Sequence, residues 1–324
     1  MFTVAESDSY DELFGDHPRQ VSKLKALVPR LSKNESKGQQ SVFAIQVTVF
    51  PSHGLVIGST VHHSACDGVG SVNFMCTWAA ICHVNNPTVI LAPTPVTVEL
   101  NRSIVPDPDV LTSFKLKAEK IHFLKEVLLH EAAKRNVTVR CSTTVVVYAY
   151  AWVGYVKAKS TMFETDDVYC IFVTDCRQLF QPPIPMSYLG NCIGPSVVQA
   201  KLKYIVGPDG FFEACQAIGK TFDEVKKVGI QNVKNCAKIS LEIGSKKPFG
   251  TSGSVRFKIY DVDFGWGKPA KVDIVSIAYS GAMAIAETRE QGGVEIGLCF
   301  TKRETEVFTD YIENGLKYMS TLRN

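Results

Sequence analysis

The strongest constraint on the fold of this chain is a pair of strand-like runs joined by a short turn. Residues 42–50 and 55–63 are both rich in Val, Ile, Phe and Thr, and the four residues between them include a proline and a glycine. Two such runs around a short turn predict a β-hairpin. The second strand would end at two adjacent histidines, His62 and His63, and a side chain at a strand end is held firmly.

A helix is expected soon after this hairpin. Four apolar side chains in segment 71–83 recur at helical spacing and form one face: Phe74, Trp78, Ile81 and Cys82. Farther along, the patterns predict helices over 116–135 and 210–228, a buried helix ending near Trp152, a helix from Glu304, and strands over 168–174, 255–264 and 271–279. Asp209 is placed to cap the helix over 210–228. This alternation of strands and helices in both halves predicts an α/β fold.

The length and composition predict two domains. The chain has 324 residues, 45% hydrophobic and 21% charged, which is typical of a globular protein. At about 150 residues per domain, this length corresponds to two domains. Five prolines lie between residues 85 and 109, where periodic runs are few. We therefore expect a first domain over residues 1–95, a connector over 96–110 and a second domain over 111–324.

The charge balance and the apolar segments argue against two classes of partner. There are 35 Lys and Arg residues against 32 Asp and Glu, a net charge of +3, and no long run of like charge that could follow a phosphate backbone. The apolar segment 141–156 is shorter than the roughly 20 residues that a membrane-spanning helix needs. We therefore expect neither nucleic acid nor a membrane as a partner.

The N-terminal segment and the cysteines indicate a cytosolic protein. The first 16 residues include five acidic side chains and no basic cluster before an apolar core, so neither a secretory signal nor a transit peptide is predicted. The ten cysteines include no CxxC pair, which argues against a zinc site or a redox motif. Free thiols and no bound metal are therefore expected.

One motif combines groups suited to acid–base chemistry. His63 is followed four residues later by Asp67 and then by Gly68, an HxxxDG pattern at the expected strand end. Such a histidine can remove a proton from a hydroxyl or an amine, while the aspartate anchors the turn and the glycine permits its backbone conformation. Taken alone, a histidine near an aspartate is more often structural than catalytic. Metal binding by His62 and His63 is disfavoured, because adjacent strand residues point to opposite faces.

A second motif, far downstream, changes this interpretation. Residues 263–267 read Asp-Phe-Gly-Trp-Gly, about two hundred residues after HxxxDG. Residues 175–177 read Asp-Cys-Arg, residues 188–192 read Tyr-Leu-Gly-Asn-Cys, and GGVEIGLCF lies at 292–300. In this order, the motifs resemble those of the plant BAHD acyl-CoA-dependent acyltransferases. The segment YLGNC is similar to the YFGNC motif of their anthocyanin and flavonoid branch, with Leu in place of Phe.

The resemblance implies a two-domain, chloramphenicol-acetyltransferase-like α/β fold with mixed sheets and a channel between the domains. Acyl-CoA would enter from one mouth and the acceptor from the other. The acyl group would pass to a hydroxyl of a phenolic glycoside, such as an anthocyanin or flavonoid glucoside. Acyl-CoA is then a co-substrate, no cofactor is implied, and a cytosolic monomer is expected. A condensation-type or hydrolytic relative that shares HHxxxDG on the same fold is disfavoured by DFGWG and YLGNC.

The resemblance also assigns roles around HxxxDG. His63 matches the general base that deprotonates the acceptor hydroxyl. Asp67 matches an aspartate that turns away from the substrate and pairs with an arginine, here Arg177, to hold the loop. Ser252 falls where family members place a hydroxyl near the reacting centre, and an ordinary loop serine is equally compatible with the sequence.

The segment DFGWG is interpreted as a structural turn. Asp263 would anchor the loop, and Gly265 and Gly267 would allow its tight backbone. Trp266 would be buried by neighbouring strands. In the family, this segment lies away from the chemistry.

Three residues are candidates for binding the coenzyme. Arg140, Ser142 and Thr143 offer a cation, two hydroxyls and a helix N-terminus to a phosphate or to pantetheine. The alternative for Ser142 is a plain helix N-cap.

Two departures from the family pattern leave the activity and the donor open. Family chains begin upstream of Met1, and segment 2–27 is too polar to replace sheet strands, so the hairpin over 42–63 should keep an unpaired edge. His63 would then be more exposed than a buried general base, and a weak or inactive relative is the alternative function. The malonyl branch carries a basic residue where this chain has Val69, so malonyl and aromatic donors both stay open.

Overall fold

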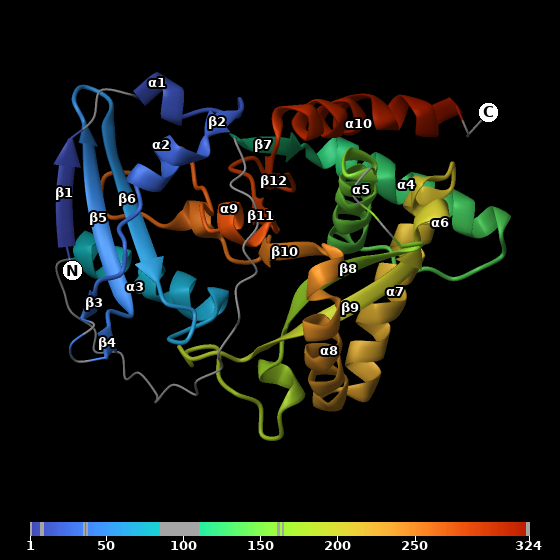
Figure 1. The fold of residues 1–324 in the computed structure, drawn as a ribbon, viewed down its shortest axis with the longest axis horizontal. Coiled ribbons are helices and arrows are strands. Elements are labelled where there is room, and N and C mark those ends of the chain that lie inside the picture. Colours follow the sequence, from blue (N-terminus) through green and yellow to red (C-terminus); the bar gives the residue numbers. More distant parts are fainter. Residues whose placement is uncertain are drawn as a thin grey trace.

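The computed structural model of the chain describes residues 2–6, 10–34, 36, 38–84, 110–160, 163 and 165–321. Its strands form a three-stranded sheet, a seven-stranded sheet and a two-stranded pair, with helices packed around them (Figure 1). The predicted α/β fold with mixed sheets is therefore confirmed. The predicted connector over 96–110 lies outside the described residues except for its last residue.

The predicted hairpin is present as β5 (Phe43–Phe50) and β6 (Gly54–Val61), which pair in antiparallel register. On its other side, β5 pairs in parallel with β1 (Phe2–Glu6). The expectation that the polar start of the chain could not supply a sheet strand is wrong. Strand pairing uses backbone groups, which every residue of the segment FTVAE offers.

Residues 10–29 cover the hairpin further. They form three short elements: α1 (Tyr10–Leu13), β2 (Arg19–Gln20) and α2 (Val21–Ala26). Apolar side chains of this segment join a buried cluster with Phe50 of β5. The chain then runs along β6, where the hydroxyl of Thr60 donates to the carbonyl of Pro29. A Cβ atom on Gly58 would lie 1.9 Å from the carbonyl oxygen of Leu27, so this close approach requires glycine.

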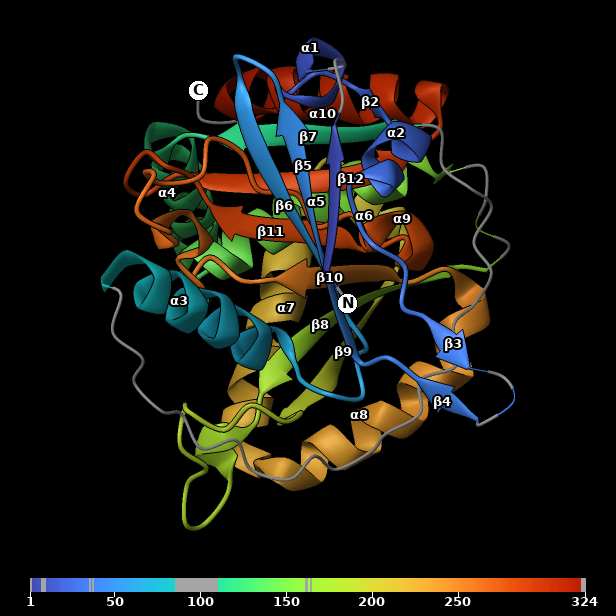
Figure 2. The same cartoon turned by 90° about the vertical axis from the view of Figure 1, so that its left-hand side faces the viewer.

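The larger sheet has the strand order β2-β7-β12-β11-β10-β8-β9. Its remaining strands are β7 (Val110–Leu116), β8 (Asp167–Asp175), β9 (Ile193–Lys201), β10 (Phe249–Gly253), β11 (Met283–Glu287) and β12 (Val294–Phe300). β10 is parallel to β8 and β11, and the other pairs are antiparallel. β2 pairs with β7, so the N-terminal segment supplies the edge of a sheet otherwise built from residues after 109. The small, three-stranded sheet lies to one side of the larger sheet (Figure 1), and seen from that side its strands run across those of the larger sheet (Figure 2).

The longer helices lie mainly around the larger sheet. They are α3 (Gly68–Val84), α4 (Ala118–Lys134), α5 (Thr143–Ala158), α7 (Gly210–Val228), α8 (Ile230–Ile243) and α10 (Lys302–Thr321), with the short α6 (Leu202–Val206) before α7. α5 is the centre of the main core, because every residue from Val145 to Val156 is buried and α4, α7 and α10 contact it. The four helices predicted after residue 115 are present, although α5 continues to Ala158, past the predicted end near Trp152. None of the described helices is long and apolar enough to cross a membrane.

The expected cap of α7 is not formed. Asp209 precedes this helix, but its side chain makes no capping hydrogen bond. Instead, its Oδ1 atom lies 2.9 Å from Nη2 of Arg135, which follows α4. The carboxylate therefore joins two helices by an ion pair and leaves the backbone N–H groups of α7 without this cap.

The two strands predicted over 255–264 and 271–279 are absent. These segments hold only the 3-10 turn η5 (Ile259–Asp261) and the short helix α9 (Ile277–Ser280). Ile259, Ile274 and Ile277 line the space above β7, β11 and β12 instead of entering the sheet. These apolar side chains pack on the face of the sheet. A segment that packs in this way has the same apolar composition as a strand, which is why the sequence pattern predicted strands here.

Candidate active site

The HxxxDG motif forms the turn between β6 and α3. The N–H of Ala65 donates to the carbonyl of His62 at 2.9 Å, and that of Ser71 donates to the carbonyl of Asp67 at 2.9 Å. His63 is exposed, whereas Asp67 is 1% exposed. The histidine and the aspartate of the motif therefore face different environments, the solvent and the interior.

Asp67 pairs with Arg177, as the family resemblance implied. Asp67 Oδ2 lies 2.9 Å from Nη1, and Nη2 donates to Oδ1 at 3.1 Å; both side chains are fully buried. Asp67 also accepts hydrogen bonds from the backbone N–H groups of Gly70 and Cys192, each at 2.9 Å. Burial disfavours the charge on Arg177, but its hydrogen bonds and ion pair with Asp67 outweigh burial and raise the pKa of the guanidinium. Both charges are compensated inside the protein.

Arg177 lies at the start of the 3-10 turn η3 (Arg177–Leu179) and also holds the YLGNC segment. Its Nη2 donates to the carbonyl oxygens of Tyr188 at 3.0 Å and Gly190 at 3.2 Å, and its Nη1 to Asp175 at 3.1 Å. A Cβ atom on Gly70 would lie 2.2 Å from the carbonyl oxygen of Leu189, so the turn and this segment are in direct backbone contact. Three motifs that are separate in the sequence thus form one buried network.

YLGNC also contacts His63 itself. The side-chain amide of Asn191 donates to the backbone carbonyl of His63 at 2.7 Å. The sequence analysis did not assign Asn191 any role, although its place in YLGNC was a signal that pointed to it. The contact joins residues 128 positions apart, which no local pattern reveals.

The two neighbouring histidines have different surroundings. Nδ1 of His62 lies 2.6 Å from the hydroxyl of Ser64 and accepts the N–H of Ser64 at 3.3 Å. His62 is half-buried. His63 is exposed, which agrees with the expectation that its imidazole is more exposed than that of a buried general base. Within the described part of the chain, no side-chain partner of the His63 imidazole is found.

Ser252 lies on β10, half-buried and paired in register with Ala284 of β11. The loop after β10 reaches the HxxxDG turn, because a Cβ atom on Gly68 would lie 2.9 Å from two ring carbons of Phe257. The structure therefore brings the segment around Ser252 toward α3, and a role for its hydroxyl stays a prediction.

The DFGWG segment is a turn held by Asp263. Its Oδ1 accepts the N–H groups of Gly265 at 2.7 Å and Gly267 at 3.0 Å, and these bonds lower the pKa of the carboxyl. Both glycines have a φ near +100°, which favours glycine. Phe264 packs edge-on against Trp78 of α3, with ring centroids 4.8 Å apart.

Trp266 is 73% exposed, so the prediction that it is buried is wrong. The prediction assumed strands on both sides of the turn, and the flanking segments are not strands. Among the described residues, the ring of Trp266 stacks on that of Phe264, at 6.1 Å between centroids.

The residues predicted to bind the coenzyme cluster before α5. Arg140 Nη1 lies 2.5 Å from Asp223 Oδ1 on α7, and its guanidinium lies over the ring of Phe222. Ser142 accepts the N–H of Val145 at 3.3 Å and thus caps α5, as its alternative interpretation predicted. Thr143 is the first residue of the helix.

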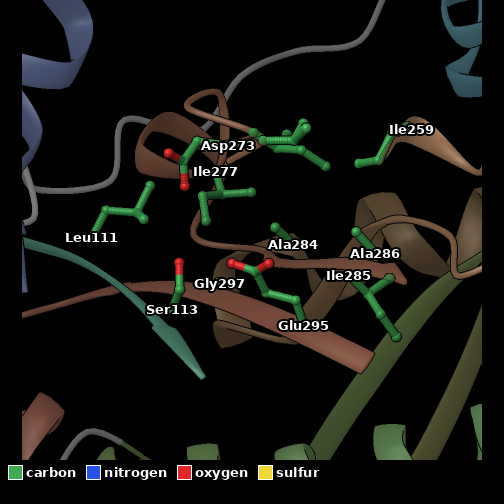
Figure 3. Close-up of a pocket in the computed structure, with 12 residues that line it drawn as sticks. Leu111, Ser113, Ile259, Asp273, Ile277, Ala284, Ile285, Ala286, Glu295 and Gly297 are labelled. Atoms are coloured by element: carbon green, nitrogen blue, oxygen red, sulfur yellow. The ribbon is translucent and has the colours of Figure 1, made fainter. Parts of the chain in front are cut away.

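A small crevice lies between β7, β11, β12 and the segment 259–277 (Figure 3). Asp273 lies on one wall, and Ser113 and Glu295 lie on the sheet opposite (Figure 3). Arg19 donates to both Asp273 and Ser113, and Tyr260 donates to Glu295 at 2.9 Å. None of the residues predicted to act in catalysis lines this crevice.

Comparisons with known proteins agree with the motifs. A sequence profile described as the Transferase family matches residues 1–314. The chain is 34% identical to phenolic glucoside malonyltransferase 2 of Arabidopsis thaliana, over 98% of this chain and 77% of the relative. It is 30% identical to a malonyl-coenzyme A:anthocyanin 3-O-glucoside-6''-O-malonyltransferase of Dahlia pinnata, over 97% of this chain and 75% of the relative.

Solved structures confirm the fold. Vinorine synthase superposes with a TM-score of 0.74 at 19% identity, over 94% of this chain and 74% of that chain. The first condensation domain of the CDA synthetase shares the fold more distantly, with a TM-score of 0.54 at 11% identity, over 98% of this chain and 75% of that chain. With the sequence match over nearly its whole length, the chain belongs to the Transferase family, the BAHD acyltransferases.

Proposed function

We propose that this protein transfers an acyl group from an acyl-CoA thioester to a hydroxyl of a phenolic glycoside of the anthocyanin or flavonoid type. Relatives named as malonyltransferases and coumaroyltransferases of such glucosides support the substrate class. In this proposal, residues 1–95 and 111–324 correspond to the two domains, and the protein acts as a cytosolic monomer without a cofactor.

The observation that carries this proposal is the difference in exposure between the two polar side chains of HxxxDG, His63 and Asp67. Asp67 is fully buried and committed to Arg177 and to two backbone N–H groups. It has no capacity left to take part in proton transfer. His63 is exposed at the end of β6, so a substrate hydroxyl can reach it. The motif therefore offers one group for chemistry, the imidazole, and one group for structure.

The reaction then follows from the chemistry of an imidazole. His63 takes the proton of the acceptor hydroxyl as the oxygen attacks the thioester carbonyl. A C–O bond forms, and the negative charge of the tetrahedral intermediate moves to the former carbonyl oxygen, which needs a hydrogen-bond donor. When the C–S bond breaks, the imidazolium returns the proton to the sulfur of coenzyme A. Ser252 is the candidate donor to the oxyanion.

Acyl transfer is tested with purified protein, a panel of malonyl-, acetyl- and coumaroyl-CoA, and a panel of phenolic glucosides and their aglycones. We expect an ester product with a glucoside and at least one of these donors. A parallel reaction without acceptor measures hydrolysis of the thioester, since the exposure of His63 would let water compete. Hydrolysis without transfer favours the weak-enzyme alternative, and the absence of both refutes the proposed function.

Binding of acyl-CoA at Arg140, Ser142 and Thr143 is part of the proposal. The Arg140 side chain is 29% exposed, so a phosphate can reach it despite the pair with Asp223. Arg135 offers a matched control. It pairs with Asp209 at 2.9 Å, lies over the ring of Phe212 and is 32% exposed.

Replacing Arg140 by Gln should raise the KM for acyl-CoA about 5- to 50-fold, the loss expected for one charge-assisted contact. The KM for the acceptor should stay unchanged. The Arg135→Gln variant, which loses ion pairs with Asp209, Glu131 and Glu213, should keep the KM of the wild type for both substrates. Steady-state kinetics with varied acyl-CoA checks this. Equal effects of the two variants would show that Arg140 does not contact the coenzyme.

A further inference from the structure

The YLGNC segment contacts both ends of the HxxxD sequence. Asn191 donates through Nδ2 to the carbonyl oxygen of His63, and the next residue, Cys192, donates its N–H to Asp67. A single dipeptide therefore fixes the first and the last residue of the turn that carries the imidazole. The proposed function so far uses His63 and Asp67 and leaves YLGNC without a task.

This dipeptide is itself rigidly held. It precedes β9, which pairs with β8 over nine residues from Asp167 opposite Lys201 to Asp175 opposite Ile193. Beyond that register, the N–H of Cys176 donates to the carbonyl of Cys192 at 2.8 Å. Asn191 is thus attached to the seven-stranded sheet, whereas His63 follows the end of β6 in the small sheet. The amide bridges the two sheets at the backbone of His63.

The Asn191 amide has one orientation that suits this contact. A carbonyl oxygen only accepts, so Nδ2 must face His63, and the opposite orientation would place two oxygen atoms 2.7 Å apart. Asn191 Oδ1 is buried and has no partner among the described residues. The bond to His63 is therefore the one hydrogen bond of this side chain within that part of the chain.

We propose that Asn191 is a positioning residue for the acyl transfer. By holding the backbone carbonyl of His63, its amide keeps the imidazole at the place where the acceptor hydroxyl arrives. The exposed ring has no side-chain partner of its own in the described structure, so its position depends on the backbone that carries it. This inference rests on the proposed function, because it assigns Asn191 a role through His63.

Asn73 provides a matched control. It lies on α3, and its Nδ2 donates at 2.8 Å to the carbonyl oxygen of Met186, in the loop that leads to YLGNC. The bond has the same chemistry and nearly the same length as that of Asn191, and it also joins the chain after β6 to this loop. It does not touch His63.

The test replaces each asparagine by Leu, which keeps the size and removes the amide. Asn191→Leu should lower kcat about 10- to 100-fold, the range expected when a catalytic group is displaced by about 1 Å, with KM values within about threefold of the wild type. Asn73→Leu should leave kcat within about threefold. Asn191→Gln, which keeps a donor, should recover part of the loss. Equal losses in the two Leu variants, or a loss that resides in KM, would overturn the proposal.

A double-mutant cycle separates positioning from general destabilisation. If Asn191 acts through His63, adding Asn191→Leu to His63→Ala should lower the residual rate less than twofold. If Asn191→Leu lowers the rate of the His63→Ala variant by the same factor as it lowers that of the wild type, the proposal is contradicted.

Hydrogen exchange supplies a readout that is independent of activity. Asn191→Leu should speed amide exchange in peptides covering residues 62–66 more than Asn73→Leu does. Unchanged exchange there would refute the positioning role. If the wild type shows no acyl transfer, the proposed function fails, while this measurement still tests whether Asn191 holds the turn.

Discussion

His63→Ala is expected to lower kcat for acyl transfer by about 10² to 10⁴-fold, the contribution of a positioned general base. Binding of acyl-CoA should stay nearly the same, because the exposed imidazole has no side-chain partner in the described structure whose loss would disturb the fold. Steady-state kinetics and calorimetric titration with acyl-CoA measure the two quantities. A variant with the rate of the wild type would remove His63 from the mechanism.

His62→Ala is the control for this prediction. His62 is half-buried and bonded to Ser64, so its loss should affect thermal stability more than turnover. A larger rate loss at His62 than at His63 would reverse the assignment of the two histidines. The comparison is sharp because the residues are neighbours and share the same backbone turn.

Breaking the Asp67–Arg177 pair should have the largest effect on stability. Asp67→Asn leaves the buried Arg177 guanidinium without its main counter-charge, which costs about 3–5 kcal/mol in the free energy of unfolding. Arg177→Gln should cost a similar amount and should also free the carbonyl groups of Tyr188 and Gly190. Urea unfolding measures both. Activity should fall as well, because the turn that carries His63 loses its anchor.

The double variant tests whether the two residues act as a pair. Asp67→Asn with Arg177→Gln should be less destabilising than the sum of the single variants, because no buried charge is left uncompensated. Asp261→Asn is the exposed control. Its pair with Lys268 is 2.6 Å long with both side chains 56% exposed, and its loss should leave the free energy of unfolding nearly unchanged. Additive effects at Asp67 and Arg177 would contradict the coupled network.

The local elements of this chain could be predicted where a segment carries its own pattern. The hairpin, α3 after HxxxDG and the amphipathic α4 follow from periodicities within a few residues. The same reasoning failed over 255–279, where apolar residues lie on the sheet without joining it. It also failed for β1, because strand formation there depends on β5 as a pairing partner. It failed for Trp266 because the exposure of a side chain depends on which other segments pack over it.

The sequence by itself determined the hairpin, the turn that presents His63 and the set of motifs that indicates an acyltransferase. The partner of Asp67 came from the family resemblance, and the structure confirmed it. Only the tertiary structure decided that Asn191 reaches His63, and that Tyr188 and Gly190 accept from Arg177. The physical reason is the separation along the chain between the residues in contact. Periodicity records the contacts of a side chain with its own element, whereas a bond between residues 128 positions apart exists only after two sheets have packed together.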